Sequence, residues 1–445
     1  MRTPFLLPLA AMMFSAAMPA SAAPKAPAAS AATAVPAEVV VAAARKEVLA
    51  RYVLPETATK LDAALAAAGA AHAFDSLQGE ALANKVNDVM RTVTKDAHLS
   101  MTYAPEMAAA LAGRPLSDDE DGELPPEFIR QITRDNGGVA KLEVLPGNIR
   151  YLDYRGFEWG APAATEAIAN AMAFLRGGDA VIIDLRANGG GSPDAVAAMA
   201  SYFLPPATKL MRFEMRSDAG QATATHAPPF SLAGKPVYVL TSKRTFSAAE
   251  EFASHVSAFG FGTLVGENTG GGGFRNTILP LPGGHVMSIS VGRAVHALTG
   301  RDWEAVGVAP KIAVPADQAL IRARSEAMAA IVAAAPASER PAAERILAYY
   351  RALAAPIDSG RQLADYEGRY GERTIARDAA GNLTTRRGDN PPTRLVAIGP
   401  DTFVPENTPT QRISFVADGS AIVALDADGP GGQPQRAARA ALALK

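Results

Sequence analysis

The chain runs VIIDLRANGGG from residue 181 to residue 191. Residues 180–185 form a mostly apolar run, which an Asn/Gly cluster ends. A run of this length bounded by turn residues is typical of a buried central strand. Around it, helical spacing occurs at 162–174, 193–203 and 247–259, and further strand-like runs occur at 139–144, 149–152, 236–241, 263–265 and 286–291. This alternation predicts an α/β domain with a central sheet.

The regions that flank this core have different patterns. From Glu38 to about Met107, apolar residues recur at helical spacing, which predicts a small domain of about three helices. Residues 114–126 are polar and acidic and are expected to form a loop. An alanine-rich helical stretch begins at 315, and short β-like runs follow Leu363. Two of these runs flank an Asp-Gly turn at 418–419, as the strands of a hairpin do.

These patterns divide the chain into segments. We expect a helical N-terminal domain at 38–137, an α/β core at 138–314, a helical connector at 315–360 and a small C-terminal β-domain at 361–445.

The first residues have the pattern of an export signal. Arg2 supplies a positive charge, residues 4–18 are mostly apolar, and residues 20–22 (Ala-Ser-Ala) fit a small-x-small cleavage site. We therefore expect a signal peptide at 1–22, followed by a disordered Ala/Pro/Ser-rich leader at 23–37. An N-terminal membrane anchor is the alternative, but the apolar stretch is short for a spanning helix. No later segment has that length, so no integral membrane segment is expected after cleavage.

Composition narrows the classes of function. The chain contains no cysteine, which excludes thiol catalysis and thiolate metal sites and is compatible with export only if no disulfides are needed. Lys and Arg number 43 and Asp and Glu 45, so there is no basic excess to attract nucleic acid or an anionic membrane. Neither a metal-ligand spacing nor a phosphate-binding loop occurs, so no cofactor or metal is expected. A periplasmic or secreted protein fits these features.

A second motif, TFSAAEE at 245–251, lies between an apolar strand and a helix. This position would place Ser247 at a sheet edge, beside the N–H groups of a helix N-terminus that stabilise negative charge. The same spacing of Ser247 and Glu250 also fits a capping box, in which the serine only satisfies backbone N–H groups. The glycines at 189–191 likewise fit either a plain turn or a loop that approaches a ligand. Asp184 and Arg186 are equally suited to holding that loop and to touching a substrate.

Taken in order along the chain, the motifs resemble the tail-specific (C-terminal-processing) serine peptidase family. The matching segments are DAHL at 96–99, DLRANGGG at 184–191, TFSAAE at 245–250, LVGENTGGG at 264–272 and DWEAVGVAP at 302–310. Residues 52–55 resemble the branch that includes interphotoreceptor retinoid-binding protein and tricorn-like enzymes, so the similarity covers about residues 38–314. The resemblance implies a crotonase-like α/β catalytic core and peptide or protein substrates. The chain leaves no room between His98 and Val139 for the PDZ domain that many members carry.

The resemblance also implies roles for individual residues. Ser247 would be the nucleophile, and the N–H groups of Ala248 and of one glycine of 189–191, for which we choose Gly190, would hold the oxyanion. Many members use a lysine in a Gly-Lys-Gly segment as the base. Here the matching residues 270–273 are all glycine, which rules out that Ser–Lys dyad.

The tricorn-like arrangement instead implies that His98 is the base and that Glu304 orients it. A neutral imidazole would take the proton of Ser247 and later give it to the leaving amine. In such enzymes a serine relays the contact, but Ala97 stands at that position, so Glu304 must reach His98 directly or through water or another hydroxyl. Rival bases are His285 and His296, and rival orienting groups are Glu267 and Asp302.

The sequence therefore predicts an exported serine-type peptidase that acts through an acyl-enzyme on Ser247. The alternative is a non-catalytic protein that binds an apolar ligand or a peptide on the same scaffold, because one fold can carry both functions. Cleavage specificity and oligomeric state are not predicted.

Overall fold

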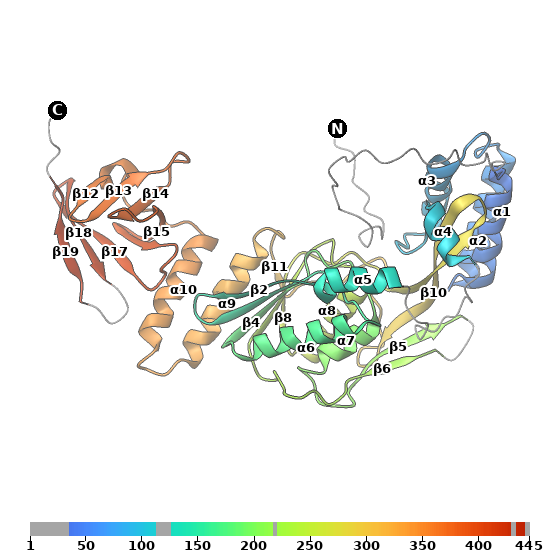
Figure 1. Ribbon diagram of the computed structural model, residues 1–445, viewed down its shortest axis with the longest axis horizontal. Coiled ribbons are helices and arrows are strands. Elements are labelled where there is room, and N and C mark those ends of the chain that lie inside the picture. The colour runs from blue at the N-terminus through green and yellow to red at the C-terminus, as the bar shows by residue number, and fades with distance from the viewer. Residues whose placement is uncertain (1–34, 113–125, 217–219, 429–432, 441–445) are drawn as a thin grey trace.

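The computed structural model describes residues 35–112, 126–216, 220–428 and 433–440. Figure 1 shows helices α1–α4 at one end, an α/β core in the middle and an antiparallel sheet at the other end. The expected signal peptide and nearly all of the expected loop at 114–126 lie outside the described residues.

The core is built on the predicted central sheet. Its strand order is β11-β8-β7-β4-β3-β2, parallel except for the antiparallel pair β2 and β3. The strand bounds are β2 Val139–Leu145, β3 Ile149–Tyr154, β4 Ala180–Asp184, β7 Val237–Thr241, β8 Thr263–Gly266 and β11 Ile312–Ala313. Strand β4 lies between β3 and β7 and is buried along its whole length, as its apolar run predicts.

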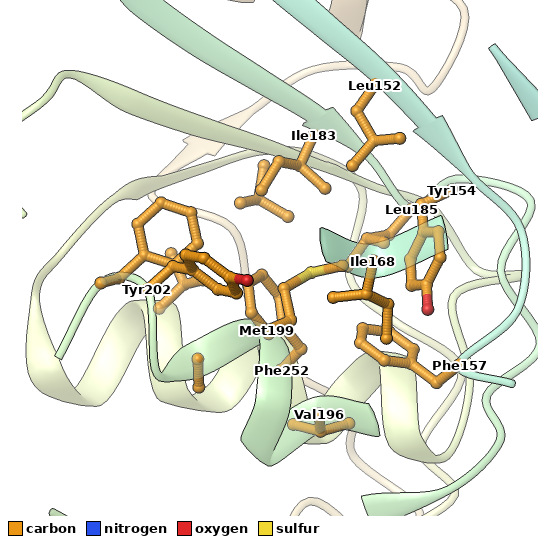
Figure 2. Packing of buried hydrophobic residues seen from close by; sticks show 14 of the residues in the cluster. Leu152, Tyr154, Phe157, Ile168, Ile183, Leu185, Val196, Met199, Tyr202 and Phe252 are labelled. Atoms are coloured by element: carbon orange, nitrogen blue, oxygen red, sulfur yellow. The ribbon is translucent and has the colours of Figure 1, made fainter. Parts of the chain in front are cut away.

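Helices cover both faces of this sheet. Val181 and Ile183 of β4 pack with helices α6 (Pro162–Arg176), α7 (Pro193–Ala200) and α8 (Ala248–Phe259). Ile182 points to the opposite face, where it packs with α9 (Ala319–Ala334) and α10 (Arg340–Ala354). Figure 2 shows the first of these layers, in which Met199 and Phe252 lie beneath Ile183.

The expected connector is two helices rather than one continuous stretch. Helix α9 ends at Ala334, and Ala335, its C-cap, has extended backbone. Pro336 follows, and a proline disfavours helical backbone in the residue before it. Helix α10 then packs against α9 on the same face of the sheet, so both helices contribute to one core.

A second sheet joins the N-terminal helices to the core. Its long strand β10 (His285–His296) pairs with β9 (Phe274–Leu281) on one edge, and with β1 (Ser100–Tyr103) and β5 (Lys209–Met215) on the other. Strand β6 (Ala222–Ala224) pairs with β5. Helices α1 (Ala37–Arg51), α2 (Pro55–Ala70) and α3 (Gly79–Arg91) form the three predicted helices and pack on this sheet with α4 (Pro105–Leu111) nearby. Helix α5 (Pro126–Arg134) packs on the core.

Strand β1 corrects the expectation that the helical pattern continues to about Met107. Residues 100–103 pair with β10, and both the N–H and the carbonyl of Met101 are hydrogen-bonded by the buried Asn87 side chain. The local pattern is too short to reveal this pairing, because β10 is almost 200 residues away in the sequence.

The C-terminal region is an antiparallel sheet with its own apolar core. The order β12 to β19 follows the sequence, and the predicted hairpin is formed by β17 and β18. Bounds are β12 Gly368–Tyr370, β13 Arg373–Arg377, β14 Leu383–Arg387, β15 Thr393–Gly399, β16 Thr402–Pro405, β17 Arg412–Asp418, β18 Ala421–Asp428 and β19 Gln435–Ala438. Among the described helices, none has the length and apolarity to cross a membrane.

Candidate active site

Ser247 lies at the turn that leads from strand β7 into helix α8, as the sequence predicts. Its backbone has φ 54° and ψ −123°, a conformation that residues with a side chain rarely adopt. A strained strand-to-helix turn of this kind exposes a serine oxygen at the top of a sheet in other hydrolases. Strain of this size persists only where the surrounding structure holds it.

The glycine turn after β4 holds the Ser247 turn in place. A Cβ on Gly190 would lie 2.7 Å from the Cβ of Ser247 and 2.9 Å from the carbonyl oxygen of Phe246, so only glycine fits there. The N–H of Phe246 donates to the carbonyl of Asn188 (3.1 Å), and the Asn188 amide donates to the carbonyl of Tyr154 (3.0 Å). Thr245 Oγ1 donates to the carbonyl of Leu185. The two motifs recognised separately in the sequence therefore form one structural unit.

The imidazole of His98 meets Ser247 across this turn. His98 Nε2 lies 3.1 Å from Ser247 Oγ, although the two residues are 149 positions apart. His98 has 2% of its surface exposed, and its ring contacts the Phe246 ring at a centroid distance of 4.7 Å. A serine oxygen within hydrogen-bonding distance of an imidazole nitrogen is the geometry that proton transfer between them requires.

Burial sets the protonation state of this imidazole. It lowers the pKa of His98 to about 4, and the negative charge of Asp96 only partly opposes that effect. His98 is therefore neutral at neutral pH and can accept a proton.

Asp96 is a site residue that the sequence reasoning missed. Its Oδ1 accepts hydrogen bonds from the backbone N–H of His98 (2.8 Å) and of Leu99 (3.3 Å), and its Oδ2 accepts one from Ser290 Oγ (2.7 Å). Aspartate commonly binds the backbone N–H two residues further on. The Asp-Ala-His spacing at 96–98 was the available signal. The hydrogen bonds that Asp96 accepts fix the backbone that presents His98.

Glu304 lies close to His98, but no hydrogen bond joins the two side chains. Glu304 Oε2 accepts from the N–H of Gly273 (2.7 Å) and of Phe274 (3.2 Å). Within the described structure, Glu304 Oε1 and His98 Nδ1 are both buried without a hydrogen-bond partner. One carboxylate oxygen of Asp96, one ring nitrogen of His98 and one carboxylate oxygen of Glu304 lie within 4.8 Å of one another. The direct contact considered from the sequence is thus not made in this arrangement.

The environment also favours the neutral form of Glu304. Burial, followed by the negative charge of Asp96, raises the pKa of Glu304 to about 8, although two backbone N–H groups act in the opposite direction. Two carboxylates this close to one imidazole could also share a metal ion. Because His98 Nε2 already faces Ser247 Oγ, we interpret the group as acid–base machinery.

Glu250 does more than the capping box implied. Its carboxylate is fully buried and accepts hydrogen bonds from the N–H of Ser247 (2.9 Å), of Gly271 (2.6 Å) and of Gly272 (2.7 Å), and from Thr269 Oγ1 (2.6 Å). Burial raises the pKa of Glu250 above its ordinary value, although these four hydrogen bonds act in the opposite direction. The carboxylate therefore connects the serine turn to the glycine loop at 270–273, which passes beside His98.

The structure contradicts the choice of Gly190 as an oxyanion donor. Its N–H already donates to Asn188 Oδ1 at 2.9 Å. The next glycine, Gly191, lines the same pocket as Ser247 and Ala248. In the part of the chain that is described, the N–H groups of Gly191 and Ala248 donate to no protein acceptor. Both N–H groups lie beside Ser247 in the described structure.

A pocket of about 290 Å³ opens beside these groups. Besides Gly191, Ser247 and Ala248, it is lined by the start of β9, by β5 and β10 side chains, and by Trp303 and Glu251.

The other polar candidates have structural partners elsewhere. Arg186 donates to both carboxylate oxygens of Asp184 and to the carbonyl of Ala316, so this pair holds the loop. His285 contacts the carbonyls of Pro282 and Gly79, and Asp302 pairs with Arg293. His296 contacts His255 rather than Ser247, and the cations Lys243 and Arg244 are exposed.

Comparison with known proteins finds a family that part of this chain resembles. Residues 148–314 match the family described as Peptidase family S41. Two curated relatives are carboxyl-terminal-processing proteases, each 29% identical: one from Picosynechococcus sp. over 42% of this chain and 45% of the relative, and one from Synechocystis sp. over 38% and 40%. The chain thus spans less than half the length of either relative.

Solved structures with a similar arrangement include a putative peptidase from Parabacteroides merdae and a photosystem II D1 C-terminal processing protease, both 18% identical. The first has a TM-score of 0.48 and covers 67% of this chain and 96% of the other. The second has a TM-score of 0.39 and covers 63% and 94%.

Proposed function

We propose that this protein is an exported serine peptidase that cleaves peptide bonds through an acyl-enzyme on Ser247. The match of residues 148–314 to the family described as Peptidase family S41 supports this proposal. The observation that carries the proposal is the 3.1 Å approach of His98 Nε2 to Ser247 Oγ at a strained strand-to-helix turn. A capping serine needs neither an imidazole partner nor a strained backbone.

In the proposed first step, His98 Nε2 accepts the proton of Ser247 Oγ while the oxygen attacks the substrate carbonyl carbon. The oxyanion that forms accepts hydrogen bonds from the N–H groups of Ala248 and Gly191, at the positive end of helix α8. The imidazolium then gives its proton to the leaving amine, and the C–N bond breaks. Water, deprotonated by His98, hydrolyses the ester and restores the serine.

Glu304 is proposed to act on His98 in its ionised form. As the imidazolium develops, its Nδ1–H needs an acceptor, and Oε1 of the neighbouring Glu304 is buried without a hydrogen-bond partner in the described structure. A small closing movement or one bridging water would join the two atoms. Asp96, already hydrogen-bonded to the backbone of His98, adds negative charge that favours imidazolium.

Labelling with a fluorophosphonate probe tests the proposal. We expect the probe to add once, at Ser247, as judged by intact mass and peptide mapping. Ser247→Ala should abolish the label, and His98→Ala should slow labelling by about 10²- to 10⁴-fold, because general-base assistance is lost. A variant with the exposed His72 replaced by alanine is the control.

Two outcomes would contradict the proposal. An unlabelled wild-type protein that cleaves no member of a peptide library would favour the binding-protein alternative. A His98→Ala variant labelled at the wild-type rate would remove His98 as the base while keeping Ser247. Export is tested separately, by finding mature protein outside the cytoplasm with its N-terminus after Ala22.

A further inference from the structure

The backbone of Phe157 runs beside the glycine turn that supports Ser247. Phe157 follows strand β3 and forms a parallel bridge with Gly191. Its N–H donates to the carbonyl of Gly190 (2.8 Å), and its carbonyl accepts from the N–H of Ser192 (2.8 Å). A Cβ on Gly191 would lie 2.2 Å from the carbonyl oxygen of Phe157, so only glycine fits against this backbone. The two hydrogen bonds therefore fix the chain on both sides of Gly191.

These hydrogen bonds decide which way the N–H of Gly191 points. The carbonyl of Gly190 and the N–H of Gly191 belong to one trans peptide, whose planarity makes them point in opposite directions. Because that carbonyl faces the N–H of Phe157, the N–H of Gly191 faces away from Phe157. Phe157 is fully buried in the core, whereas Gly191 lines the pocket with Ser247 and Ala248. The side away from Phe157 is therefore the side of the pocket.

A different group holds the peptide one position earlier. The N–H of Gly190 donates to Asn188 Oδ1 (2.9 Å), and the Asn188 amide donates in turn to the carbonyl of Tyr154 (3.0 Å). Asn188 therefore uses the N–H of Gly190, and Phe157 uses its carbonyl. Both peptides of Gly190 are fixed in this way, and the N–H of Gly191 is the next donor along the turn.

The ring of Phe157 connects this backbone to the helix that follows the proposed nucleophile. It packs edge-on against the Tyr154 ring at a centroid distance of 4.9 Å and lies 5.8 Å from the Phe252 ring. Figure 2 shows these three side chains in the core beneath the sheet. Phe252 belongs to helix α8, which begins at Ala248, the residue with the second proposed oxyanion donor. One buried side chain thus links the two chain segments that carry the two N–H groups.

We propose that Phe157 is a positioning residue for the oxyanion hole. Its backbone sets the direction of the Gly191 N–H, and its ring holds that backbone against helix α8. The inference rests on the proposed acyl-enzyme mechanism and adds to it a residue that acts through Gly191 rather than on the substrate.

Fluorophosphonate labelling of Phe157→Ala is the first test. Without the ring the segment loses its anchor, and the Gly191 N–H is misplaced. The maximal rate of Ser247 labelling should fall by about 10- to 100-fold, because negative charge that develops on the phosphonyl oxygen loses a donor. The probe concentration that gives half the maximal rate should not change. Phe157→Leu, which keeps most of the buried volume, should restore most of the rate.

Phe203→Ala is the matched control. Phe203 is 3% exposed and lies in the same core, where its ring is 6.4 Å from the Phe252 ring. Both alanine variants should lower the melting temperature by similar amounts, but only Phe157→Ala should slow labelling at a temperature at which all variants are folded. Equal slowing in the two variants, or a wild-type rate in Phe157→Ala, overturns the positioning role.

A crystal structure of the labelled wild-type protein tests the orientation directly and does not require any variant to fold. The phosphonyl oxygen should lie within about 2.7–3.1 Å of the backbone nitrogens of Gly191 and Ala248. The carbonyl of Gly190 should still accept from Phe157. A Gly190 carbonyl that faces the pocket overturns the inference and leaves Ser247 as the nucleophile. A protein that the probe does not label contradicts the peptidase proposal instead, and the unlabelled crystal structure then tests the direction of the Gly191 N–H.

Discussion

At the scale of single residues, the backbone of Ser247 and the burial of its neighbours define the site. The backbone of Ser247, with its φ of 54°, is held by the hydrogen bond from its N–H to the Glu250 carboxylate and by the close approach of Gly190. Burial then acts in opposite directions on the two titratable groups near the serine: it lowers the pKa of His98 to about 4 and raises that of Glu304 to about 8.

These pKa values predict a rate that increases with pH in two steps. His98 must be neutral to accept the serine proton, so kcat/KM should increase as pH passes about 4. Glu304 must be ionised to stabilise the imidazolium, so a second increase should occur near pH 8. In Glu304→Gln the step near pH 8 should disappear, and the rate above it should be about 10- to 100-fold lower. The measurement is a pH–rate profile of peptide cleavage between about pH 3 and pH 10, which spans both steps. A step near 8 that survives in Glu304→Gln would exclude this role.

The same shifts predict the pH dependence of stability. The folded pKa of Glu304 lies above its ordinary value of 4.5, so its contribution to stability is present below pH 4.5 and is lost as pH increases through about 8. The folded pKa of His98 lies below 6.5 because the buried imidazole resists protonation. The folded protein therefore loses stability as pH falls from 6.5 to about 4. Thermal unfolding should therefore show that the wild-type protein loses more stability between pH 6 and pH 9 than Glu304→Gln does. An equal loss would contradict the raised pKa.

At the scale of elements, the site is made where two turns and one loop meet. The glycine turn after β4 packs on the serine turn after β7, and the glycines at 270–273 pass beside His98. A Cβ on Gly272 would lie 2.8 Å from His98 Cε1 and closer still to the Phe246 ring. Glycine is needed here because backbone and functional side chains touch, which also explains why no lysine stands in this loop.

Gly190→Ala tests the contact between the two turns. Its Cβ would overlap Ser247, and Gly190 has a φ of 113° that alanine avoids. We expect fluorophosphonate labelling to slow by about 100-fold, because a displacement near 1 Å is enough to disrupt the alignment. Gly189→Ala is the matched control, since a Cβ there meets no atom within 4 Å. If both variants react at the wild-type rate, Gly190 does not support the serine.

At the scale of the whole molecule, helices α9 and α10 connect the core to the C-terminal sheet. Their apolar cluster contains residues of the central sheet and also Val396 and Val404 from β15 and β16. Tyr350 of α10 is 1% exposed, and its hydroxyl donates to the carbonyl of Pro146 in the turn between β2 and β3 (3.0 Å). We propose that the C-terminal β-region at 361–445 is a separate domain attached through this cluster.

Tyr350→Ala tests that attachment. Removing a buried aromatic ring and its hydrogen bond should lower the free energy of unfolding by about 3 kcal/mol or more. Labelling of Ser247 should not change below the unfolding temperature, because the ring lies on the face of the sheet opposite to α8. Denaturant unfolding measures the first effect, and Phe128→Ala, at a side chain that is 43% exposed, should change it by less than about 0.5 kcal/mol. A loss equally small in Tyr350→Ala would mean that the cluster does not hold the two parts together.

The sequence by itself determined the elements and the chemistry-bearing types of residue. The buried strand β4, the serine at the start of α8 and the hairpin at 418–419 all follow from local patterns of apolar, glycine and capping residues, which act over a few positions. The family resemblance identified Ser247, His98 and Glu304, and two of these lie within hydrogen-bonding distance of each other in the structure. The local patterns around Asp96 and Glu250 were weak signals, because an ordinary turn explains the first and an ordinary helix cap explains the second.

Only the tertiary structure decided how these parts meet. It paired β1 with a strand almost 200 residues away, gave the N–H of Gly190 to Asn188, and left Glu304 near His98 without a hydrogen bond. It also placed the backbone of Phe157 beside Gly191. The physical reason is that hydrogen bonds, burial and pKa shifts depend on distances between groups far apart in the chain, and no local pattern encodes those distances.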